Sequence, residues 1–338
     1  MNGRNGGYDL LAGRVREQVE DILEREFARR QIEHYAPRLA QTIRRYIDRP
    51  AKLLRPVLLL ETAAAYGREP SQPLLELAAA TELLHTFALL HDDCIDGPFE
   101  TDEPARPGCA PGAEQEAGAL GMRILAGDFL HALAIGVIVD TVAHRGLPSA
   151  VLEIVRSVSL DTVLGQALDL ELAERPVAAR SIEELYRLYD LKTGRYSFDA
   201  PMQIGALCAA APERDREPLR RLATHLGRAY QLCDDLVDTE RLLRLPRERR
   251  EAVAPWELNL LAAVSAETSE MPDDPYDALN TVTPLALREF LQPRLRELLG
   301  GAVLEVGRLS VEPHFAQRLL EAATRHLASY TVFDDLHS

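Results

Sequence analysis

Apolar residues recur at helical spacing along nearly the whole chain, and this pattern restricts the possible folds more than any other feature of the sequence. Between Leu74 and Ala88, apolar side chains follow one another at intervals of three and four residues, which is typical of amphipathic or buried helices. The alternation that marks β-strands is nearly absent. The sequence therefore predicts an all-α fold. We expect helices at 8–34, 36–47, 52–66, 71–95, 113–144, 148–173, 181–194, 196–210, 215–241, 284–299 and 312–328.

The breaks between these helices fall at 97–112, 209–218 and 245–284. The last break is long and contains five prolines, and segments of this kind are usually functional lids or disordered. Neither an internal repeat nor a shift in composition marks a domain boundary. We therefore expect one domain over 1–338, with its motifs between about 45 and 240.

Charge and cysteine content restrict the class of protein. A formal net charge of -15 argues against nucleic acid, whose binders usually carry a basic face, and suits a site that collects divalent cations. The cysteines form no CxxC pair and the N-terminus shows no secretory signal, which predicts a cytoplasmic protein. The most apolar run, 129–139, is about half of a bilayer span, so we expect no transmembrane segment.

An acidic cluster ends one apolar helix, in the sequence HTFALLHDDCID at residues 85–96. Asp92 and Asp96 are four residues apart and share a helical face, with Asp93 beside them. Three neighbouring carboxylates repel one another, and burial makes the repulsion worse, so they require cations. Such hard oxygen ligands suit Mg²⁺, which bridges to substrate phosphates. The sequence therefore predicts a metal site here.

A second cluster repeats this spacing in GRAYQLCDDLVD, residues 227–238. It contains Asp234, Asp235 and Asp238, and Gln231 lies one turn before Asp235. Either cluster alone is a weak signal, because acidic helix ends are common. Two copies, each ending an apolar helix, predict a pair of facing metal-binding clusters.

Lysine is rare in this chain. Of 38 basic residues only Lys52 and Lys192 are lysines. Where arginine has replaced lysine almost everywhere, a surviving lysine indicates a position that needs a compact ammonium group; chance survival is the alternative.

The ordered motifs resemble those of the trans-isoprenyl diphosphate synthase (polyprenyl synthetase) family, in particular short-chain farnesyl and geranylgeranyl diphosphate synthases. PAKLLRP (50–56) resembles GGKRLRP, AGDFL (126–130) resembles AGD[YF]L, GQALDL (165–170) matches GQxxDL, and LKTG (191–194) matches KTG. The resemblance implies the isoprenoid synthase fold, a single large helical bundle around a central cavity. It also implies a homodimer.

The resemblance implies a metal-binding role for both clusters. Three Mg²⁺ ions would bridge them to an allylic prenyl diphosphate. The main ligands would be three of the aspartates, Asp92, Asp96 and Asp234. The other three would lie close by, namely Asp93, Asp235 and Asp238.

The substrate-binding residues implied by the resemblance fall into two groups. Lys192 would contact the leaving diphosphate, while Thr193 and Gln231 would orient dipoles toward the allylic cation. The diphosphate of isopentenyl diphosphate would be held by Lys52, Arg55 and His85. The metals would act as Lewis acid, and a proton would leave to the departing pyrophosphate, so catalysis would rest on positioning and electrostatics.

Product length depends on the apolar cavity that receives the growing tail. Ala88, one turn before Asp92, would leave room for it, while Phe87 would form the floor. In the family, an aromatic residue five positions before the first motif resembles geranylgeranyl-type synthases, so we expect a C20 product, with C15 next. The alternative is that Phe87 is ordinary core packing.

Three departures from the family pattern concern mainly the isopentenyl diphosphate side. The arginine pair RRGxP appears only as ARPGCAP (105–111), where Arg106 keeps one role. Leu53 stands where the family has arginine, and the GKxT segment is replaced by arginines between 244 and 250. Three alternatives therefore stay open: a terpene cyclase, a prenyltransferase with a non-standard acceptor, and a non-catalytic subunit of a heteromeric synthase. His91-Asp92 with His85 also suggests an HD-type metal phosphohydrolase, although a third histidine at suitable spacing is lacking.

Overall fold

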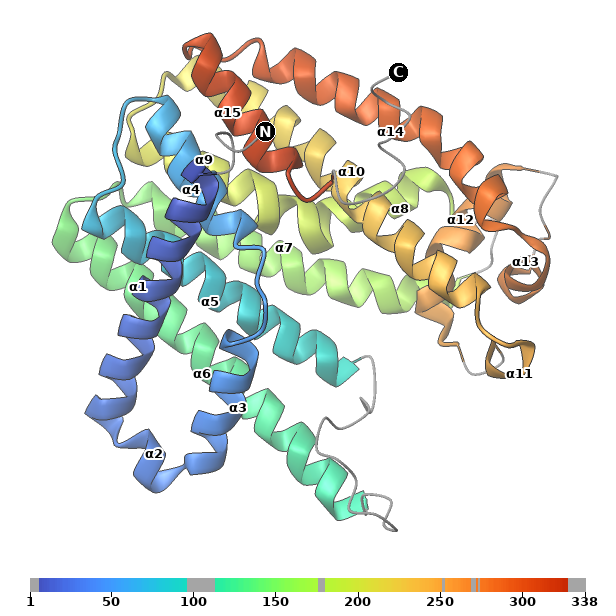
Figure 1. Ribbon diagram of the computed structural model, residues 1–338, viewed down its shortest axis with the longest axis horizontal. Helices are drawn as coiled ribbons and strands as arrows, with labels where there is room; N and C mark the ends of the chain where they lie inside the picture. The colour runs from blue at the N-terminus through green and yellow to red at the C-terminus, as the bar shows by residue number, and fades with distance from the viewer. Residues whose placement is uncertain are drawn as a thin grey trace. The chain divides into compact units, whose positions relative to one another are not determined.

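In the computed structural model of the chain (Figure 1), every regular element within the described residues is a helix. These residues are 6–95, 113–175, 180–250, 253–268, 272 and 274–327. The all-α fold class expected from the apolar spacing is confirmed.

The chain folds into two compact units, and each is described by itself. Unit 1 comprises Met1–Leu60 and Glu69–Leu152, and unit 2 comprises Glu61–Arg68 and Glu153–Ser338. The single domain over 1–338 stays a prediction.

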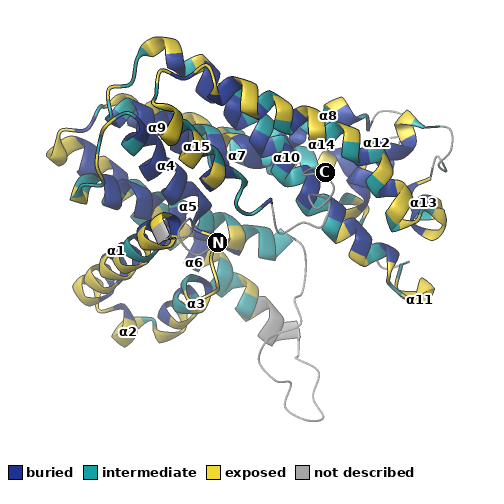
Figure 2. Ribbon diagram, turned by 45° about the horizontal axis from the view of Figure 1, so that its top comes forward, coloured by how far each residue is buried: buried dark blue, intermediate teal, exposed yellow. Residues whose placement is uncertain are grey.

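Unit 1 is organised around one central apolar helix. Its elements are α1 (Gly6–Arg30), α2 (Ile32–Tyr35), α3 (Pro37–Ile47), the first part of α4 (Leu54–Ala65), α5 (Gln72–Ile95) and α6 (Ala113–Arg145). Helix α5 packs against α1, α3 and α6, and its Leu77, Ala80 and Leu83 are buried. Figure 2 shows α1 with one exposed and one buried side, as its mixed composition requires. The helix that ends in the first acidic motif is thus held by neighbours on several sides.

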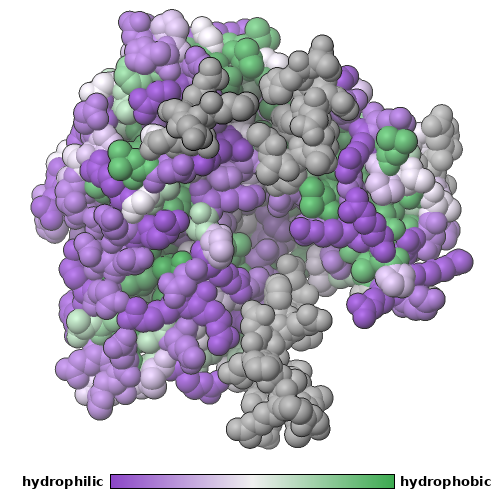
Figure 3. Space-filling model, viewed as in Figure 1, coloured by the Kyte–Doolittle hydropathy of each residue, from purple (hydrophilic) through white to green (hydrophobic). Residues whose placement is uncertain are grey.

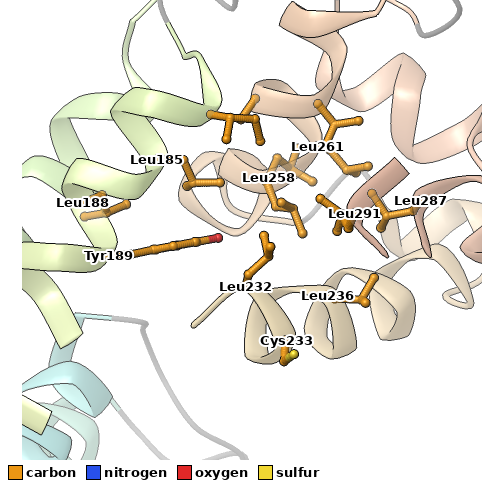
Figure 4. Close-up of a cluster of buried hydrophobic side chains, with 14 of the residues drawn as sticks. Leu185, Leu188, Tyr189, Leu232, Cys233, Leu236, Leu258, Leu261, Leu287 and Leu291 are labelled. Carbon is orange, nitrogen blue, oxygen red and sulfur yellow. The ribbon is translucent and has the colours of Figure 1, made fainter. Parts of the chain in front are cut away.

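Unit 2 is organised around α10, which packs against α14, η2 and α9. Its elements are most of α7 (Ala150–Ala173), α8 (Ile182–Tyr189), the π-helix η2 (Asp190–Asp199), α9 (Ala200–Cys208), η3 (Glu213–Asp215), α10 (Arg216–Leu243), α11 (Arg247–Arg250), η4 (Pro255–Leu258), α12 (Asn259–Glu267), α13 (Pro275–Thr281), α14 (Pro284–Val306) and α15 (Pro313–Thr324). In Figure 4, Tyr189 points toward Leu232 of α10. Leucines of η4, α12 and α14 complete this apolar cluster, among them Leu258, Leu261, Leu287 and Leu291.

Most expected helices agree with the structure to within a few residues, with three exceptions. The helix expected at 284–299 continues to Val306 in α14, and the segment 245–284 contains helices that were not expected. The third exception is the region 181–210. The sequence predicts two helices, 181–194 and 196–210, but the structure has one continuous helical run from α8 through η2 to α9. The break expected near Gly194 is wrong, because the chain there widens into a π-helix instead of ending. Gly194 is buried where η2 packs against α10.

The segment 245–284 is more helical than its prolines suggest. The structure has α11, η4, α12 and α13 within it. Pro255 and Pro275 occupy the first positions of η4 and α13, where the missing N–H of proline costs nothing because that group has no helical partner anyway. These prolines start helices rather than interrupt one.

Two helices are long and apolar enough to cross a membrane, judged by length and composition only: Gln72–Ile95 and Gly118–Arg145. The apolar window of the first is 56% buried, as in the core helix of a folded unit, while that of the second is 28% buried. The absence of a transmembrane segment stays a prediction. The face shown in Figure 3 is mainly hydrophilic with scattered hydrophobic groups.

Candidate active site

The second acidic motif lies on α10 in unit 2, and its three aspartates have different surroundings. Tyr189 donates a hydrogen bond to Asp235 Oδ2 at 2.5 Å, and Gln231 donates to Asp235 Oδ1 at 2.7 Å. Burial raises the pKa of Asp235 to about 7, against the lowering effect of these two donors. Asp235 is therefore an anchored carboxyl in a poorly solvated position.

Asp234 and Asp238 lie one helical turn apart on α10. Burial raises the pKa of Asp238, and the negative charge of Asp234 raises it further. Asp238 is paired on its outer side with Arg241, at 2.7 Å. A divalent cation held by both carboxylates would relieve their repulsion, and this oxygen donor set suits Mg²⁺.

A short hydrogen-bonded relay joins the π-helix to α10. The hydroxyl of Thr193 donates a hydrogen bond to Gln231 Oε1 at 2.8 Å. The amide nitrogen of Gln231 in turn donates to Asp235 Oδ1. The structure thus brings together three residues assigned to the site from the sequence. Such chains of hydrogen bonds rigidify a polar site.

Lys192, also in the π-helix, is held by a carboxylate of α7. Its ammonium donates to Asp169 Oδ2 at 2.6 Å, and its side chain keeps 26% of its surface exposed. The other oxygen of Asp169 accepts a hydrogen bond from Asn259 at 2.9 Å. The ammonium is only partly buried, so the ion pair with Asp169 is compatible with a contact to a substrate phosphate.

Two glycines allow the π-helix to sit close to its neighbours. A Cβ on Gly165 of α7 would stand 2.6 Å from Lys192 Cα, and a Cβ on Gly227 of α10 would stand 2.7 Å from Gly194 Cα. On the α10 side, Arg228 also grips Asp190 with two hydrogen bonds, at 2.9 and 2.6 Å. π-Helical turns are rare and occur frequently at functional sites.

The first acidic motif ends α5 in unit 1. Asp93 accepts a hydrogen bond from the hydroxyl of Tyr46 and one from Arg49 at 3.2 Å, and the Arg49 guanidinium stacks over the Tyr46 ring at 3.9 Å. Burial, and then Asp93, raise the pKa of Tyr46 to about 12. Asp92 lies beside this anchor and is partly buried. Asp96 lies outside the described residues.

Three residues assigned to the second diphosphate influence one another in unit 1. Burial lowers the pKa of His85 well below its usual range, and the charges of Arg55 and Lys52 lower it further. The protonated form of His85 is therefore disfavoured, and the charges of Arg55 and Lys52 act on its imidazole. The backbone carbonyl of Lys52 is held by the Tyr8 hydroxyl at 2.6 Å. Arg106 lies outside the described residues.

Leu53 stands where the family motif has an arginine, and its own backbone conformation is strained. Its φ is +50°, a region that costs a branched residue about 1–2 kcal/mol, and its side chain is buried. This position therefore supplies an apolar contact where the resemblance leads one to expect a charge.

Phe87 faces α6. Its ring centroid lies 4.7 Å from that of His91 and 4.8 Å from that of His131. His91 in turn lies so close to Gly127 that a Cβ there would overlap its ring. Phe87 and Ala88 are both partly buried.

The described residues contain no group of three or more histidine, cysteine, aspartate or glutamate side chains arranged to hold a metal ion on their own. His91 approaches the carboxylate of Asp128, at 3.5 Å.

Several site residues had no assigned role in the sequence. Tyr46 and Tyr189 each bond the second aspartate of a motif, and Asp169 and Asn259 support Lys192. Asp169 lies within the GQALDL motif, so the motif match could have identified it as a site residue. Nothing local marks Tyr46 or Asn259, because their partners are distant in the sequence.

The helical fold, the aspartate motif on each of two helices and the lysine-bearing π-helix define a class of protein, the one with the isoprenoid synthase fold. A model of the polyprenyl synthetase family matches residues 36–241, more than half of the chain, and the chain belongs to this family. The family recognised from the motifs is thereby confirmed.

Curated relatives include two short-chain synthases. Farnesyl diphosphate synthase of Geobacillus stearothermophilus is 33% identical over 199 residues, which are 57% of this chain and 64% of that protein. Geranylgeranyl diphosphate synthase of Sulfolobus acidocaldarius is 30% identical over 234 residues, 68% and 66% of the two chains. The matched part of the chain spans just under two thirds of the length of each relative.

Solved structures agree on the fold. The crystal structure of geranylgeranyl pyrophosphate synthase from Corynebacterium glutamicum, complexed with isoprenyl diphosphate and magnesium, superposes with a TM-score of 0.69 at 22% identity. The match covers 92% of this chain and 96% of that one. The isoprenoid synthase fold expected from the motifs is confirmed.

Proposed function

We propose that this protein is a Mg²⁺-dependent (E)-prenyltransferase that condenses isopentenyl diphosphate with an allylic diphosphate to give a C15–C20 prenyl diphosphate, with geranylgeranyl diphosphate favoured. The observation that carries this proposal is the family match over 36–241, which includes both aspartate motifs and the lysine-bearing π-helix. The two relatives named above make C15 and C20 products by name.

The metal-binding role falls to the aspartates. Asp234 and Asp238 carry mutually repelling charges, which supports their assignment, and Asp92 and Asp96 are assigned by the motif. Asp93 and Asp235, each held by a tyrosine, orient the two motifs beside the ligands. When bound, Mg²⁺, three ions by analogy with the family, supplies the positive charge that lets a diphosphate leave.

The allylic diphosphate is bound by Lys192, whose ammonium is held by Asp169. The oxygens of Thr193 and Gln231 direct their negative ends toward the positive charge that develops on the allylic carbon. The hydrogen bond between Thr193 and Gln231 fixes these dipoles before the reaction begins. The departing pyrophosphate takes up the proton that the new product loses.

The second diphosphate, that of isopentenyl diphosphate, is bound by Lys52, Arg55 and His85, together with Arg106. Burial and the charges of Arg55 and Lys52 lower the pKa of His85, which favours a neutral imidazole that donates a hydrogen bond without adding a third positive charge. The electrostatic interaction of His85 with Lys52 and Arg55 supports an anion-binding site formed by these three residues in unit 1.

Product length is assigned to Phe87, with Ala88 beside it. The ring of Phe87 is held between His91 and His131, which gives the tail a fixed wall. We expect Phe87→Ala to extend the product by one or more C5 units, measured by mass spectrometry of the hydrolysed products. An unchanged product length would assign Phe87 to core packing.

The protein is proposed to act as a cytoplasmic homodimer. Helix α6 carries exposed apolar side chains, Leu120, Ile124, Leu125 and Val139, and a second copy would cover them. Three cysteines, Cys94, Cys208 and Cys233, are free thiols, which suits a reducing compartment.

A second candidate is a cyclase or prenyltransferase that ionises the allylic diphosphate but uses a non-standard acceptor. The buried, strained Leu53 favours it, because an arginine is missing from the isopentenyl diphosphate side. A non-catalytic subunit is the third candidate.

The test is an incubation of the pure protein with Mg²⁺, isopentenyl diphosphate and dimethylallyl, geranyl or farnesyl diphosphate in turn, with products identified by mass spectrometry. Products longer by C5 units support the synthase. Pyrophosphate release with alcohols or hydrocarbons and no elongation supports the second candidate. No turnover, with Asp92→Ala and Asp234→Ala indistinguishable from the parent, supports a non-catalytic subunit.

A further inference from the structure

Asn259 is a buried amide in an otherwise apolar helix start. Only 3% of its surface is exposed, and its neighbours Leu258, Leu260 and Leu261 are all buried. Burying an amide among leucines is unfavourable unless the amide makes hydrogen bonds. The hydrogen bonds of the Asn259 side chain therefore indicate why an amide is present at this buried position.

Those contacts lead to one residue on α7. The Asn259 amide nitrogen donates to Asp169 Oδ1 at 2.9 Å and to the Asp169 backbone carbonyl at 3.3 Å. Both partners are acceptors, so the amide has one possible orientation, with its NH₂ group toward Asp169. Asn259 thus forms hydrogen bonds with both the side chain and the backbone of Asp169.

Asp169 is the partner of Lys192. With Oδ1 held by Asn259 and Oδ2 by Lys192 at 2.6 Å, the plane of the carboxylate is determined at both ends. Without Asn259, the carboxylate can rotate and carry the ammonium with it. A lysine side chain has four flexible bonds and little directional preference of its own.

This pair of contacts adjoins the relay on α10. The negative charge of Asp169 and the positive charge of Lys192 both act on the carboxyl of Asp235. Asn259 therefore connects α12 to the same group of residues as α7, η2 and α10. Through it the segment 245–284, to which the motifs assign no role, reaches the site.

We propose that Asn259 is a positioning residue, which through Asp169 holds the Lys192 ammonium in the orientation that binds the leaving diphosphate. This inference rests on the proposed role of Lys192 but not on chain elongation itself. It assigns to this segment a task in binding the pyrophosphate group.

The test measures binding of inorganic pyrophosphate with Mg²⁺ by titration calorimetry, so that no turnover is needed. We expect Asn259→Leu, which keeps the volume and removes the donor, to weaken pyrophosphate binding about tenfold, because a displaced Lys192 ammonium loses part of its charge-assisted contact with the pyrophosphate. The matched control is Asn280→Leu, in the same segment, where the amide bonds Tyr276 within α13. Its affinity should stay within twofold of the parent.

A double-mutant cycle separates positioning from a general loss of structure. If Asn259 acts through Asp169, then Asn259→Leu should add little to Asp169→Asn, since residues acting in one chain are not additive. The stoichiometry of each titration gives the folded fraction, so a variant that folds only in part is still interpretable. Asn259→Ser, a smaller change, repeats the measurement.

The proposal fails if folded Asn259→Leu binds pyrophosphate as tightly as the parent, or if its effect adds fully to that of Asp169→Asn. It also fails if Asn280→Leu weakens binding equally. A parent protein that binds pyrophosphate but does not elongate would overturn the proposed function and leave this test intact.

Discussion

At the residue scale, the two aspartate motifs have one contact in common, made by the second aspartate of each. In each motif the second aspartate accepts a hydrogen bond from a tyrosine, Tyr46 for Asp93 and Tyr189 for Asp235. A phenol that donates to a carboxylate forms a strong, charge-assisted hydrogen bond. The anchored aspartate fixes the end of its helix turn, and in the motif on α10 this presents Asp234 and Asp238 in a defined geometry.

Lys192 should matter for the allylic substrate in particular. We expect Lys192→Ala to lower kcat/KM for the allylic diphosphate on the order of 100-fold, because a charge-assisted contact worth about 1.5–3 kcal/mol is lost. Steady-state kinetics with each substrate varied in turn would measure it. Lys52→Ala is the comparison, since it should raise KM for isopentenyl diphosphate instead. Identical kinetic defects in both variants would refute the separate assignments.

The thiols of unit 2 should be unreactive at neutral pH. Burial raises the pKa of Cys208 to about 11 and that of Cys233 to about 12, and Asp234 contributes to the second shift. A raised thiol pKa leaves less thiolate at pH 8, and the thiolate is the reactive form. We expect iodoacetamide at pH 8 to modify the more exposed Cys94 before Cys208 and Cys233, measured by peptide mass spectrometry over time. Equal rates at Cys94 and Cys233 would contradict the burial of Cys233.

Some of these residues could be found in the sequence and others could not. Lys192, Thr193 and Gln231 lie in motifs, and the structure joins Thr193 and Gln231 by a hydrogen bond. Asn259 could not be found, because its partner Asp169 is 90 residues away and only folding brings the two together. The contacts of Tyr46 and Arg49 with Asp93 could not be predicted for the same reason, because these residues are also distant in the sequence.

At the element scale, helix positions were predictable because apolar spacing is local and each helix of a bundle must bury one side. The π-helix was not predictable from local spacing, because the elements that pack against it come from distant parts of the sequence. It is stabilised from outside, by Gly165 of α7 and Gly227 of α10, which allow close backbone approach. The helices of 245–284 were missed because prolines at helix starts look like breaks.

A methyl group at Gly165 should disturb this packing. We expect Gly165→Ala to destabilise the protein by about 1–3 kcal/mol, as overpacking commonly does, since the added Cβ meets backbone atoms of Leu191 and Lys192. Thermal or urea unfolding would measure the change. Gly136→Ala on α6 is the control, because a Cβ there has open space and alanine favours a helix by about 0.5–1 kcal/mol. Equal stability of both variants would show that α7 and η2 are not in tight contact.

At the scale of the whole molecule, the exposed apolar side chains of α6 bear on assembly. Within its described part, this helix combines high hydropathy with little burial, and exposed apolar patches usually mark an interaction surface. A second copy of the chain is the occupant implied by the family. The fold class was predictable from the sequence, whereas the partner of α6 rests on the resemblance.

The homodimer has a direct test. We expect light scattering to give about twice the chain mass of 37.5 kDa, and Leu125→Glu to shift the protein toward monomer, because a charge at an apolar interface is costly. Leu304→Glu is the control, since Leu304 is exposed on α14 and is not part of the α6 face. A monomeric parent, or equal dissociation by both variants, would reject α6 as the interface.

Amine chemistry in this protein is confined to very few places. Reagents that acylate lysine would find only Lys52 and Lys192 among the side chains, and Lys192 is tied to Asp169 yet partly accessible. On the role proposed for Lys192, a mild acylating label is a probe of the site, and protection by pyrophosphate would report occupancy without an engineered tag. Lysine-directed cross-linkers and immobilisation through side-chain amines would react at the same two positions.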